Sequence, residues 1–404
     1  MPSSPSTRSA RLSLVFSALG HMYAHLFAPI FYVVALTLEN DMRLSHGEVI
    51  GLILVGNVLF GVAAPLAGWL GDRWSATGMI GLFFVGTGGG MVMTGLASSP
   101  VEIGAGLAVT GLFASIYHPV GIAWLVRNAK ARGKALGING VFGGIGPALA
   151  AVAAGSLTEF AGWRSAFFVP GAVIIATGVA FYWLLARRAI VESKIDRLPD
   201  VPASRQDTLR AVAVLAVTLL CTGLIYQATQ PALPKVFSER VGDIAAGGVL
   251  GVSALVALVY LVAGALQVLA GHLADRYSLK VVYFTCYVLQ VPFLVLAGSL
   301  GGTSLVVVAM IMVSINVASL PAENSLVARY APSHRRGLVF GLKFVLAFGV
   351  GALGVKMEGV LYDLTGGFLW LFVVLGAIAT VGVAAAWLLP SERRAPAPVP
   401  IAAE

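Results

Sequence analysis

Two histidines stand four residues apart in the first apolar stretch of the chain, in the run His21-Met22-Tyr23-Ala24-His25. Residues at i and i+4 share one face of a helix, so both rings would point at the same neighbour. An ionisable group in such a stretch is a functional candidate, because an unpaired charge in hydrocarbon costs about 2.5–3.5 kcal/mol. Histidine changes charge near neutral pH, which suits binding a solute or relaying protons. The alternative is two neutral rings that bond to backbone or hydroxyl groups. A metal site lacks a third convincing ligand, so we expect no metal and no cofactor.

A second candidate group is the run Tyr117-His118-Pro119 in a later apolar stretch. Pro119 has no N–H to donate and therefore frees the carbonyl group of Ser115 one turn back. His118 either satisfies such local polar groups or forms, with Tyr117, part of a wall that contacts a solute. Both interpretations stay open.

A lysine, Lys343, lies two turns inside another apolar stretch. Its long side chain either reaches the membrane surface or stays as a fixed cation in a cavity, with Glu323 as the most plausible partner. If the two residues pair, they form a structural or gating lock, and if they do not, Lys343 can receive an anionic group. Other polar residues in apolar stretches are candidates for lining a cavity, although each serves equally well as a contact between helices: Tyr32, Tyr226, Gln227, Gln230, Tyr260, Gln267, Asn316 and Asn324.

The composition indicates which elements hold these groups. Hydrophobic residues make up 58% of the 404-residue chain and charged residues 11%, with a mean hydropathy of +0.90. Soluble domains have about 45–50% apolar and about 25% charged residues, so the chain has too little charge for a surface in water. A membrane-spanning helix needs about 20 mostly apolar residues. Twelve such segments lie near 11–36, 47–69, 78–97, 101–125, 134–157, 163–186, 209–233, 245–271, 280–300, 302–327, 338–361 and 366–389.

The two halves of the chain repeat each other. The segment Gly68–Arg73 carries an Asp-Arg pair between two apolar runs, and so does Gly271–Arg276, with the aspartates 275 − 72 = 203 residues apart. Duplicated hydrophobic halves are typical of secondary transporters with a solute site between the halves. We predict an all-α membrane protein with twelve transmembrane helices in two pseudo-symmetric six-helix bundles, 1–186 and 211–389. A cytoplasmic linker, 187–210, would join them, and 390–404 would be a disordered cytoplasmic tail.

The distribution of positive charge predicts the orientation. The net charge is +8, and most Lys and Arg residues fall in loops on the side that carries both ends of the chain. By the positive-inside rule both termini are cytoplasmic, and we expect a multi-pass protein of the plasma membrane, the inner membrane of a bacterium. The bias explains the charge without a nucleic-acid partner.

The repeated Asp-Arg pairs have a mechanical interpretation. Asp72 and Asp275, followed by Arg73 and Arg276, end a span on the cytoplasmic side, where a carboxylate can accept hydrogen bonds from the N-terminus of a neighbouring helix. Such contacts exist only when that face is shut and would bias a gate, whereas simple surface ion pairs are worth about 0–1 kcal/mol. Gly146-Pro147 adds a predicted kink in the fifth span, because Pro147 removes a backbone hydrogen bond.

These motifs together resemble the major facilitator superfamily over the whole chain. Gly68, Asp72 and Arg73 match its loop signature G-x-x-x-D-R/K, and the second copy keeps Gly271, Asp275 and Arg276. The sequence from Gly146 is similar to the fifth-span antiporter motif G-P-x-x-G-G, with alanine at the last two positions, whereas the antiporters' span-four arginine is replaced by Leu107-Ala108. The segment Ser115–Gly137 is similar to the fourth span of fosmidomycin-resistance-type exporters.

The resemblance implies a secondary active transporter that moves a small organic solute across the plasma membrane by alternating access. We expect proton-coupled export, a monomer in the lipid bilayer, and no enzymatic activity, because no nucleophile–base pair or metal set occurs in the loops. The first alternative is a uniporter or importer of organic anions, which Lys343 and the missing span-four arginine favour. The second is a membrane sensor or assembly protein that does not transport.

Overall fold

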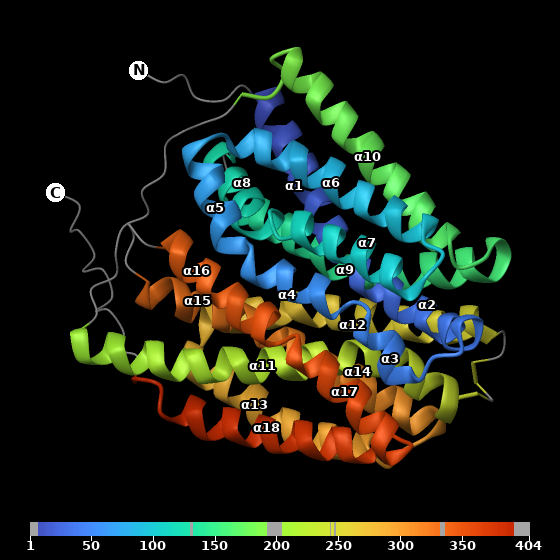
Figure 1. Cartoon of the computed structure of the whole chain (residues 1–404). Helices are drawn as coiled ribbons and strands as arrows, with labels where there is room; N and C mark the ends of the chain where they lie inside the picture. Colours follow the sequence, from blue (N-terminus) through green and yellow to red (C-terminus); the bar gives the residue numbers. More distant parts are fainter. Residues whose placement is uncertain are drawn as a thin grey trace.

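The computed structural model describes residues 7–129, 132–191, 204–242, 244–245, 248–331 and 336–391. All regular structure within these ranges is helical (Figure 1). The elements of the first half are α1 (Thr7–Ala24), α2 (Phe27–Met42), α3 (His46–Gly51), α4 (Leu54–Val62), α5 (Ala64–Arg73), α6 (Ala76–Leu96), α7 (Pro100–Ala114), η1 (Tyr117–Gly121), α8 (Ile122–Asn128), α9 (Arg132–Ala161) and α10 (Ser165–Ala186). The elements of the second half are α11 (Arg205–Arg240), α12 (Gly248–Arg276), α13 (Leu279–Ala297), α14 (Gly302–Ala318), α15 (Leu320–Tyr330), α16 (Arg336–Phe344), η3 (Val345–Val350), α17 (Leu353–Thr365) and α18 (Leu369–Trp387).

Eleven helical spans in the described ranges are long and apolar enough to cross a membrane, and the combination of α3, α4 and α5, bent by 42°, makes a twelfth. Each overlaps one of the segments predicted from the sequence, so the predicted all-α membrane fold is confirmed. The linker prediction lies partly outside the described residues, which omit 192–203. Residues 205–210, also assigned to the linker, instead begin α11, whose N-cap Ser204 accepts a hydrogen bond from the backbone N–H of Asp207. The predicted tail falls almost entirely outside the described residues.

Several spans are interrupted near their middle, and a proline lies at or just after four of these interruptions. Pro29, Pro65, Pro119 and Pro321 each lie at or just after a break between two helical segments of one span. Proline cannot donate to the carbonyl group four residues back, which breaks the helical ladder there. The two π-helical turns, η1 and η3, occur in the fourth and eleventh spans, and single π-helical turns are frequent at functional sites.

The two halves, here the N-terminal half (α1–α10) and the C-terminal half (α11–α18), meet along several helix pairs. α9 packs on α12, α4 on η3, α3 on α17, α2 on α11 and α5 on α16. The contact of α4 with η3 needs glycine, because a Cβ on Gly61 would lie 2.1 Å from the backbone nitrogen of Gly349. Small residues that let backbones approach are what drives helix association in lipid.

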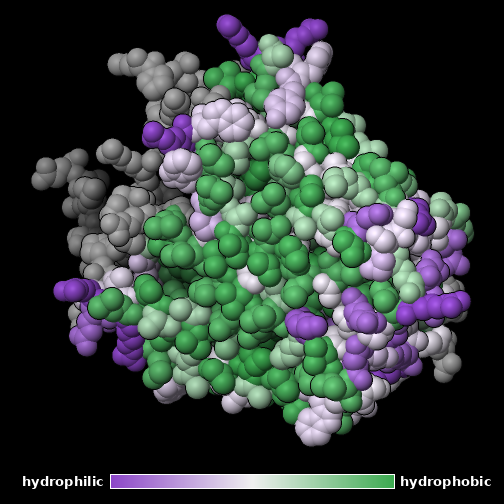
Figure 2. All heavy atoms as spheres, in the orientation of Figure 1, coloured by the Kyte–Doolittle hydropathy of each residue, from purple (hydrophilic) through white to green (hydrophobic). Residues whose placement is uncertain are grey.

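The surface has a broad apolar belt between two hydrophilic ends (Figure 2). Large apolar side chains within it are exposed, for example Val179, Leu261 and Val268 at 51–60%. We call the end where α1 begins at Thr7 and α18 ends at Trp387 the terminal face. The opposite end, where α2 ends at Met42 and α11 ends at Arg240, is the far face. A belt of this kind matches the lipid environment that the composition requires.

Candidate functional site

A small central cavity lies between the two halves and has a volume of about 20 Å³. Space of this size holds about one water molecule. An organic solute can therefore bind there only after the halves move apart. The lining side chains come from the first two spans on one side and from α11 and η3 on the other: Ala24, His25, Phe27, Ala28, Pro29, Asn57, Phe60, Tyr226, Gln227, Gln230 and Phe348.

Three histidines form a cluster beside this cavity. The ring centroids of His21, His25 and His118 are 5.1–5.3 Å apart, and one ring nitrogen of each lies within 4.8 Å of the others. His25 lines the cavity, whereas His118 is 8% exposed and stacks on Phe344 of α16 at 4.8 Å between ring centroids. The helix break after α1 and the turn η1 bring the rings together.

A buried hydrogen-bond network holds His21, one member of the histidine cluster, in place. His21 Nδ1 is 2.8 Å from the backbone oxygen of Asn139 in α9. The side-chain amide of Asn139 donates to the Tyr117 hydroxyl at 2.7 Å and to Ser17 Oγ at 3.1 Å, and the Tyr117 hydroxyl donates to the backbone oxygen of Ser17 at 2.7 Å. The Tyr117 ring also stacks on His21 at 5.2 Å. Tyr117 therefore positions His21 and does not line the cavity.

The remaining polar lining of the cavity is uncharged. Gln230 Nε2 donates to the Tyr226 hydroxyl at 2.6 Å, and both residues belong to α11, as does Gln227. On the opposite wall Asn57 Nδ2 donates to the hydroxyl of Tyr32 at 2.9 Å. The predicted candidates His25, Tyr226, Gln227 and Gln230 thus line one cavity.

Lys343 and Glu323 form a buried ion pair. The distance from Lys343 Nζ to Glu323 Oε1 is 2.8 Å, and the side chains are 5% and 1% exposed. Lys343 also donates to Asn324 Oδ1, and the hydroxyl of Tyr283 donates to Glu323 Oε2 at 3.0 Å. The pair joins α15 to α16 within one half. Of the possibilities that the sequence left open for Lys343, the structure therefore shows the one in which it pairs with Glu323. The charge of Lys343 is already neutralised.

Three other predicted candidates lie outside the cavity lining. Tyr260 is buried in α12 and Asn316 in α14. Gln267 is half-buried where α12 faces α9, and a Cβ on Gly144 would lie 3.8 Å from its Oε1. These positions suit contacts between helices.

The Asp-Arg pairs lie at the terminal face. Asp72 Oδ1 accepts a hydrogen bond from Arg127 Nη1 at 3.3 Å, so Asp72 joins α5 to α8 within the N-terminal half. Arg73, Asp275 and Arg276 have exposed side chains at the ends of α5 and α12.

Gly146 and Pro147 lie inside the continuous helix α9. A Cβ on Gly146 would lie 2.8 Å from the backbone oxygen of Met22 and 2.9 Å from His25 Cβ. This glycine therefore lets α9 pack directly against the end of α1 that carries the histidines. A gating role for Asp72, Asp275 and the Gly-Pro pair stays a prediction.

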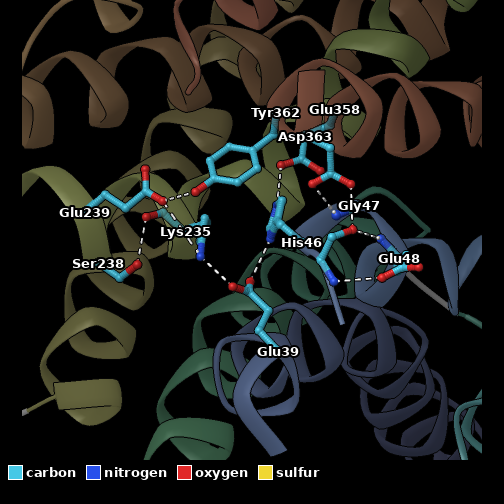
Figure 3. A network of polar contacts seen from close by, with 11 residues as sticks. Glu39, His46, Gly47, Glu48, Lys235, Ser238, Glu239, Glu358, Tyr362 and Asp363 are labelled. Atoms are coloured by element: carbon cyan, nitrogen blue, oxygen red, sulfur yellow. Dashed lines mark hydrogen bonds and ion pairs between the residues drawn. The ribbon is translucent and has the colours of Figure 1, made fainter. Parts of the chain in front are cut away.

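A group of charged residues at the far face joins the two halves (Figure 3). We call it the far-face cluster: Glu39, Ser45, His46, Gly47, Lys235, Glu239, Glu358, Tyr362 and Asp363. His46 Nδ1 is 2.8 Å from Glu39 Oε1, and His46 Nε2 is 2.8 Å from Glu358 Oε1. Lys235 Nζ is 2.5 Å from Glu39 Oε2 and 3.7 Å from Glu239 Oε1. Two of these contacts, His46–Glu358 and Lys235–Glu39, cross from one half to the other.

Backbone contacts strengthen this junction. Asp363 of α17 accepts hydrogen bonds from Ser45 Oγ at 2.6 Å and from the backbone N–H of Gly47 at 3.1 Å. A Cβ on Gly359 would lie 2.7 Å from the Cα of Gly47, so α3 and α17 touch through their backbones. Tyr362 donates to Glu239 and packs edge-on against His46 at 4.7 Å between ring centroids. Along α2 and α11 the cluster lies nearer the far face than the cavity lining does, so it joins the two halves on that side of the cavity.

The proton count of the far-face cluster follows from its hydrogen bonds. An ionised carboxylate only accepts hydrogen bonds, so a ring between two carboxylates carries hydrogen on both nitrogens. The other way to make both bonds is a neutral His46 that accepts from a protonated Glu358. In either form the His46–Glu358 contact holds one proton. Without it, two acceptors would face each other in a site where Glu358 is 0% and His46 4% exposed.

Sequence reasoning missed most of the far-face cluster: of its members only Glu358 was singled out, together with Lys356, as an interfacial residue near the outer end of the eleventh span that could act in an outer gate. Glu39, His46 and Lys235 stand near predicted span ends, where charged residues usually face water. One signal was present: Ser45 and Glu48 form a capping box, which placed His46 at the start of a helix, beside a neighbouring span. Glu358 lies two residues beyond Lys356 in the eleventh span, but Lys356 is exposed and Glu358 is fully buried.

Comparisons with known proteins fit this architecture. The family model of the Major Facilitator Superfamily matches residues 12–258 and 215–404. The fosmidomycin resistance protein of Escherichia coli (strain K12) is 24% identical over 374 residues, covering 89% of each chain. The uncharacterised MFS-type transporter YfnC of Bacillus subtilis (strain 168) is 22% identical over 392 residues, covering 94% of this chain and 93% of that one. The puromycin resistance protein pur8 of Streptomyces alboniger is 27% identical over 142 residues, only 28% of its length.

Solved structures show the same fold. A bacterial homolog of the human lysosomal transporter Spinster, in an inward-facing and unoccupied conformation, superposes with a TM-score of 0.71 at 15% identity and covers 95% of both chains. The occupied inward-facing form of that homolog gives a TM-score of 0.69 over the same coverage. The resemblance predicted from the loop motifs, including the one to the fosmidomycin-resistance branch, is confirmed.

Proposed function

Because the chain belongs to the major facilitator superfamily and is a membrane transporter rather than an enzyme, we propose that it exports a small organic solute in exchange for protons. It works as a monomer in the plasma membrane, with the terminal face in the cytoplasm and the far face outside. The observation that carries the proposal is a central cavity lined by both halves, which the far-face cluster joins on one side of the cavity.

The geometry supports alternating access between the two faces. The cavity is too small for an organic solute, and its walls belong to different halves. Release of the solute to the outside therefore requires the His46–Glu358 and Lys235–Glu39 contacts to separate. Hydrogen bonds that involve charged groups contribute about 1.5–3 kcal/mol each, which is enough to hold a gate without locking it. Bound solute or a change in proton occupancy can shift such an equilibrium.

The far-face cluster supplies a site for the coupling proton. The proton of the His46–Glu358 contact is held only while the halves are joined at this face, because the two residues come from different halves. The groups around it are Glu39 on α2, Lys235 and Glu239 on α11, and Tyr362 and Asp363 on α17. Opening exposes His46 and Glu358 to external water, where the proton can exchange. Proton binding thereby depends on conformation, which coupling requires.

The cavity chemistry suggests the class of solute. Its lining is aromatic and amide-bearing, with His25 as the only titratable side chain besides Tyr226 among the lining residues. Lys343, the sequence's candidate for binding an anion, is paired with Glu323 at 2.8 Å. A polar or amphipathic solute that is held by hydrogen bonds and ring contacts fits such a lining better than a strongly anionic one. The names of two relatives make fosmidomycin and puromycin the first compounds to test.

The test is uptake into liposomes that contain the purified protein. Compounds that raise the thermal stability of the protein, with fosmidomycin and puromycin included, are offered to liposomes that are acidic inside. We expect uptake driven by the proton gradient in the wild type and in Glu102→Gln. Glu102 is a matched control, because it is a far-face carboxylate that caps α7 within one half.

The variants locate the coupling proton. Glu358→Gln should lose the response to the gradient but keep exchange of the solute across the membrane. If His25→Ala loses that response and Glu358→Gln keeps it, the proton belongs to the histidine pair predicted from the sequence and not to the far-face cluster. No gradient-dependent uptake of any stabilising compound would contradict proton-coupled export.

A further inference from the structure

The histidine cluster has features beyond those that solute transport needs. His21, His25 and His118 come from two interrupted spans, and one ring nitrogen of each lies within 4.8 Å of the others. Aromatic rings surround them: Tyr117 stacks on His21, and Phe344 stacks on His118. Three imidazoles that share one site are the ligand set of open, three-coordinate zinc sites such as catalytic His₃ centres.

The orientation of His21 is already that of a metal ligand. Its Nδ1 is 2.8 Å from the backbone oxygen of Asn139, and a carbonyl oxygen only accepts, so Nδ1 carries the hydrogen. Nε2 of His21 is therefore left with a free lone pair. Metal-bound histidines almost always donate their second N–H to a carbonyl or carboxylate in this way, which fixes the tautomer and the ring. Asn139 is itself held by Tyr117 and Ser17.

The second independent observation is an unsatisfied nitrogen. His118 is 8% exposed, and its Nε2 is buried without a hydrogen-bond partner among the residues that the structure describes. Leaving a buried polar atom unpaired costs about 1–3 kcal/mol. The stacking against Phe344 at 4.8 Å and the edge contact with Phe60 at 5.7 Å hold the ring in this position. A buried, unpaired ring nitrogen beside two other imidazoles is suited to bind a cation when the ring carries its hydrogen on Nδ1.

We propose that His21, His25 and His118 bind one divalent transition-metal ion of the zinc class, with the fourth coordination position facing the central cavity. Metal–nitrogen bonds of about 2.0–2.1 Å in a tetrahedron put the nitrogens about 3.3 Å apart, so the rings must approach one another by about 1–2 Å. Gly143 lets the His21 ring pack closely against α9 in its present position, because a Cβ there would lie 2.4 Å from His21 Cε1. Imidazole ligands favour zinc, copper, nickel and iron over magnesium and calcium.

Charge balance indicates what occupies the fourth position. Within the described residues the metal-ligating group contains histidines only, with no carboxylate. The nearby Lys343 is neutralised by Glu323 at 2.8 Å and adds no net charge. A dication in a neutral, buried site needs a negative ligand, because an uncompensated buried charge is costly. Since His25 lines the cavity, that ligand is a metal-chelating group of an otherwise polar solute, which loses its proton when it binds the metal; this last step rests on the proposed function.

The site differs from the sequence-based expectation of no metal. The expectation rested on two histidines of one helix face, and the third ligand comes from η1, whose position against α1 is a property of the folded chain. Metal binding can be measured without any transport, so its failure would leave the proposed function standing, and an absence of transport would leave the metal site standing.

The test is a titration of detergent-solubilised, tag-free protein with Co²⁺, which reports tetrahedral nitrogen coordination through its visible absorption bands. We expect one equivalent of Co²⁺ to bind and Zn²⁺ to displace it. His25→Ala and His118→Gln should each weaken Co²⁺ binding by about 100-fold. Changing only the hydrogen-bond partner of a metal ligand already lowers metal affinity by about 10- to 100-fold, and removing the ligand itself should cost at least as much. His272→Ala is the matched control, because His272 is an exposed histidine of α12, and it should bind as the wild type does.

A second measurement guards against misfolded variants. Zn²⁺ should raise the thermal unfolding temperature of the wild type and of His272→Ala but not that of His118→Gln, with all three eluting as single species in size-exclusion chromatography. Wild-type protein without cobalt bands at millimolar Co²⁺ would overturn the proposal. Equal affinity in His118→Gln and the wild type would do the same.

Discussion

Replacing Glu358 with glutamine should open the far face. Glu358 is 0% exposed, and its Oε1 is 2.8 Å from His46 Nε2 across the boundary between the halves. The substitution keeps the shape of the side chain and removes the charge and the shared proton. A hydrogen bond that involves a charged group is worth about 1.5–3 kcal/mol. Glutamine can still form a neutral hydrogen bond with His46, worth about 0.5–1.5 kcal/mol, so the loss is about 1–1.5 kcal/mol. The equilibrium between the closed and open far face should therefore shift towards the open form by about 5- to 13-fold, at about 1.4 kcal/mol per tenfold.

The assay is the labelling rate of a single cysteine inside the cavity. Ala28 lines the cavity and is 8% exposed, so Ala28→Cys adds little volume and is shielded while the far face is closed. The native Cys221 and Cys286 are replaced by alanine to leave one thiol. An impermeant thiol reagent is added to intact cells, and the labelling rate is proportional to the open population when opening is fast and rare.

We expect the rate to rise by about 5- to 13-fold in Glu358→Gln, because the charged hydrogen bond to His46 is replaced by a neutral one. Glu102→Gln makes the same chemical change in a carboxylate that caps α7 inside one half, and it should label at the wild-type rate. Protein amount and elution in size-exclusion chromatography must match among the three. Equal rates in Glu358→Gln and the wild type would show that the far-face cluster does not hold the cavity closed.

Three further outcomes are expected. Ser204→Cys on a cysteine-free background should be protected from impermeant thiol reagents in intact cells, because the basic loops place the N-cap of α11 in the cytoplasm; ready labelling would reverse the orientation. Asp72→Asn removes the 3.3 Å contact with Arg127 and should lengthen spin-label distances between the terminal-face ends of α5 and α16. That exposed pair is worth about 0–1 kcal/mol, so the shift in population is at most about five-fold, and unchanged distances would remove Asp72 from the mechanism. Lys343→Met should lower the thermal unfolding temperature strongly, because breaking a buried ion pair costs about 3–5 kcal/mol. Adding Glu323→Gln should recover most of the loss, since no unpaired charge then stays buried. A Lys343→Met variant as stable as the wild type would show that the pair is not structural.

The spans were predictable because they depend on local composition. Runs of about 20 apolar residues must cross the lipid whatever their neighbours are. The prolines that interrupt the spans were equally readable: Pro119 and Pro321, which occupy matching places in the two halves of the sequence, both lie in helix breaks. The linker was predicted to include residues 205–210 because most of them are polar. In the structure these residues begin α11, since a polar segment that follows an N-cap can still be helical outside the membrane.

The site was predictable only where residues share one helix. His21 and His25 stand on one face and were recognised as a pair, and Tyr226 and Gln230 share a face of α11 in the same way. His118 joins the pair because η1 crosses α1, which no spacing in the sequence specifies. Whether Lys343 pairs with Glu323 could not be predicted for the same reason, because the two residues lie on different helices.

The far-face cluster was unpredictable for a different reason. Its members stand at the ends of four spans, where a charged side chain ordinarily faces water. Only the packing of α3 on α17, with Gly47 against Gly359, buries His46 and Glu358 together. Whether a charged residue at a span end faces water or joins the two halves depends on tertiary contacts between the halves, which the sequence does not specify.

The most direct test of transport by alternating access is a pair of distances, one across each face, measured by spin labels in the same protein. Asn40→Cys with Leu364→Cys spans the far face, and Trp74→Cys with Leu338→Cys spans the terminal face; all four positions are exposed. In Glu358→Gln relative to the wild type, the far-face distance should lengthen while the terminal-face distance shortens. Two distances that both stay the same, or that both lengthen, would contradict a rocking motion of the two halves about the central cavity.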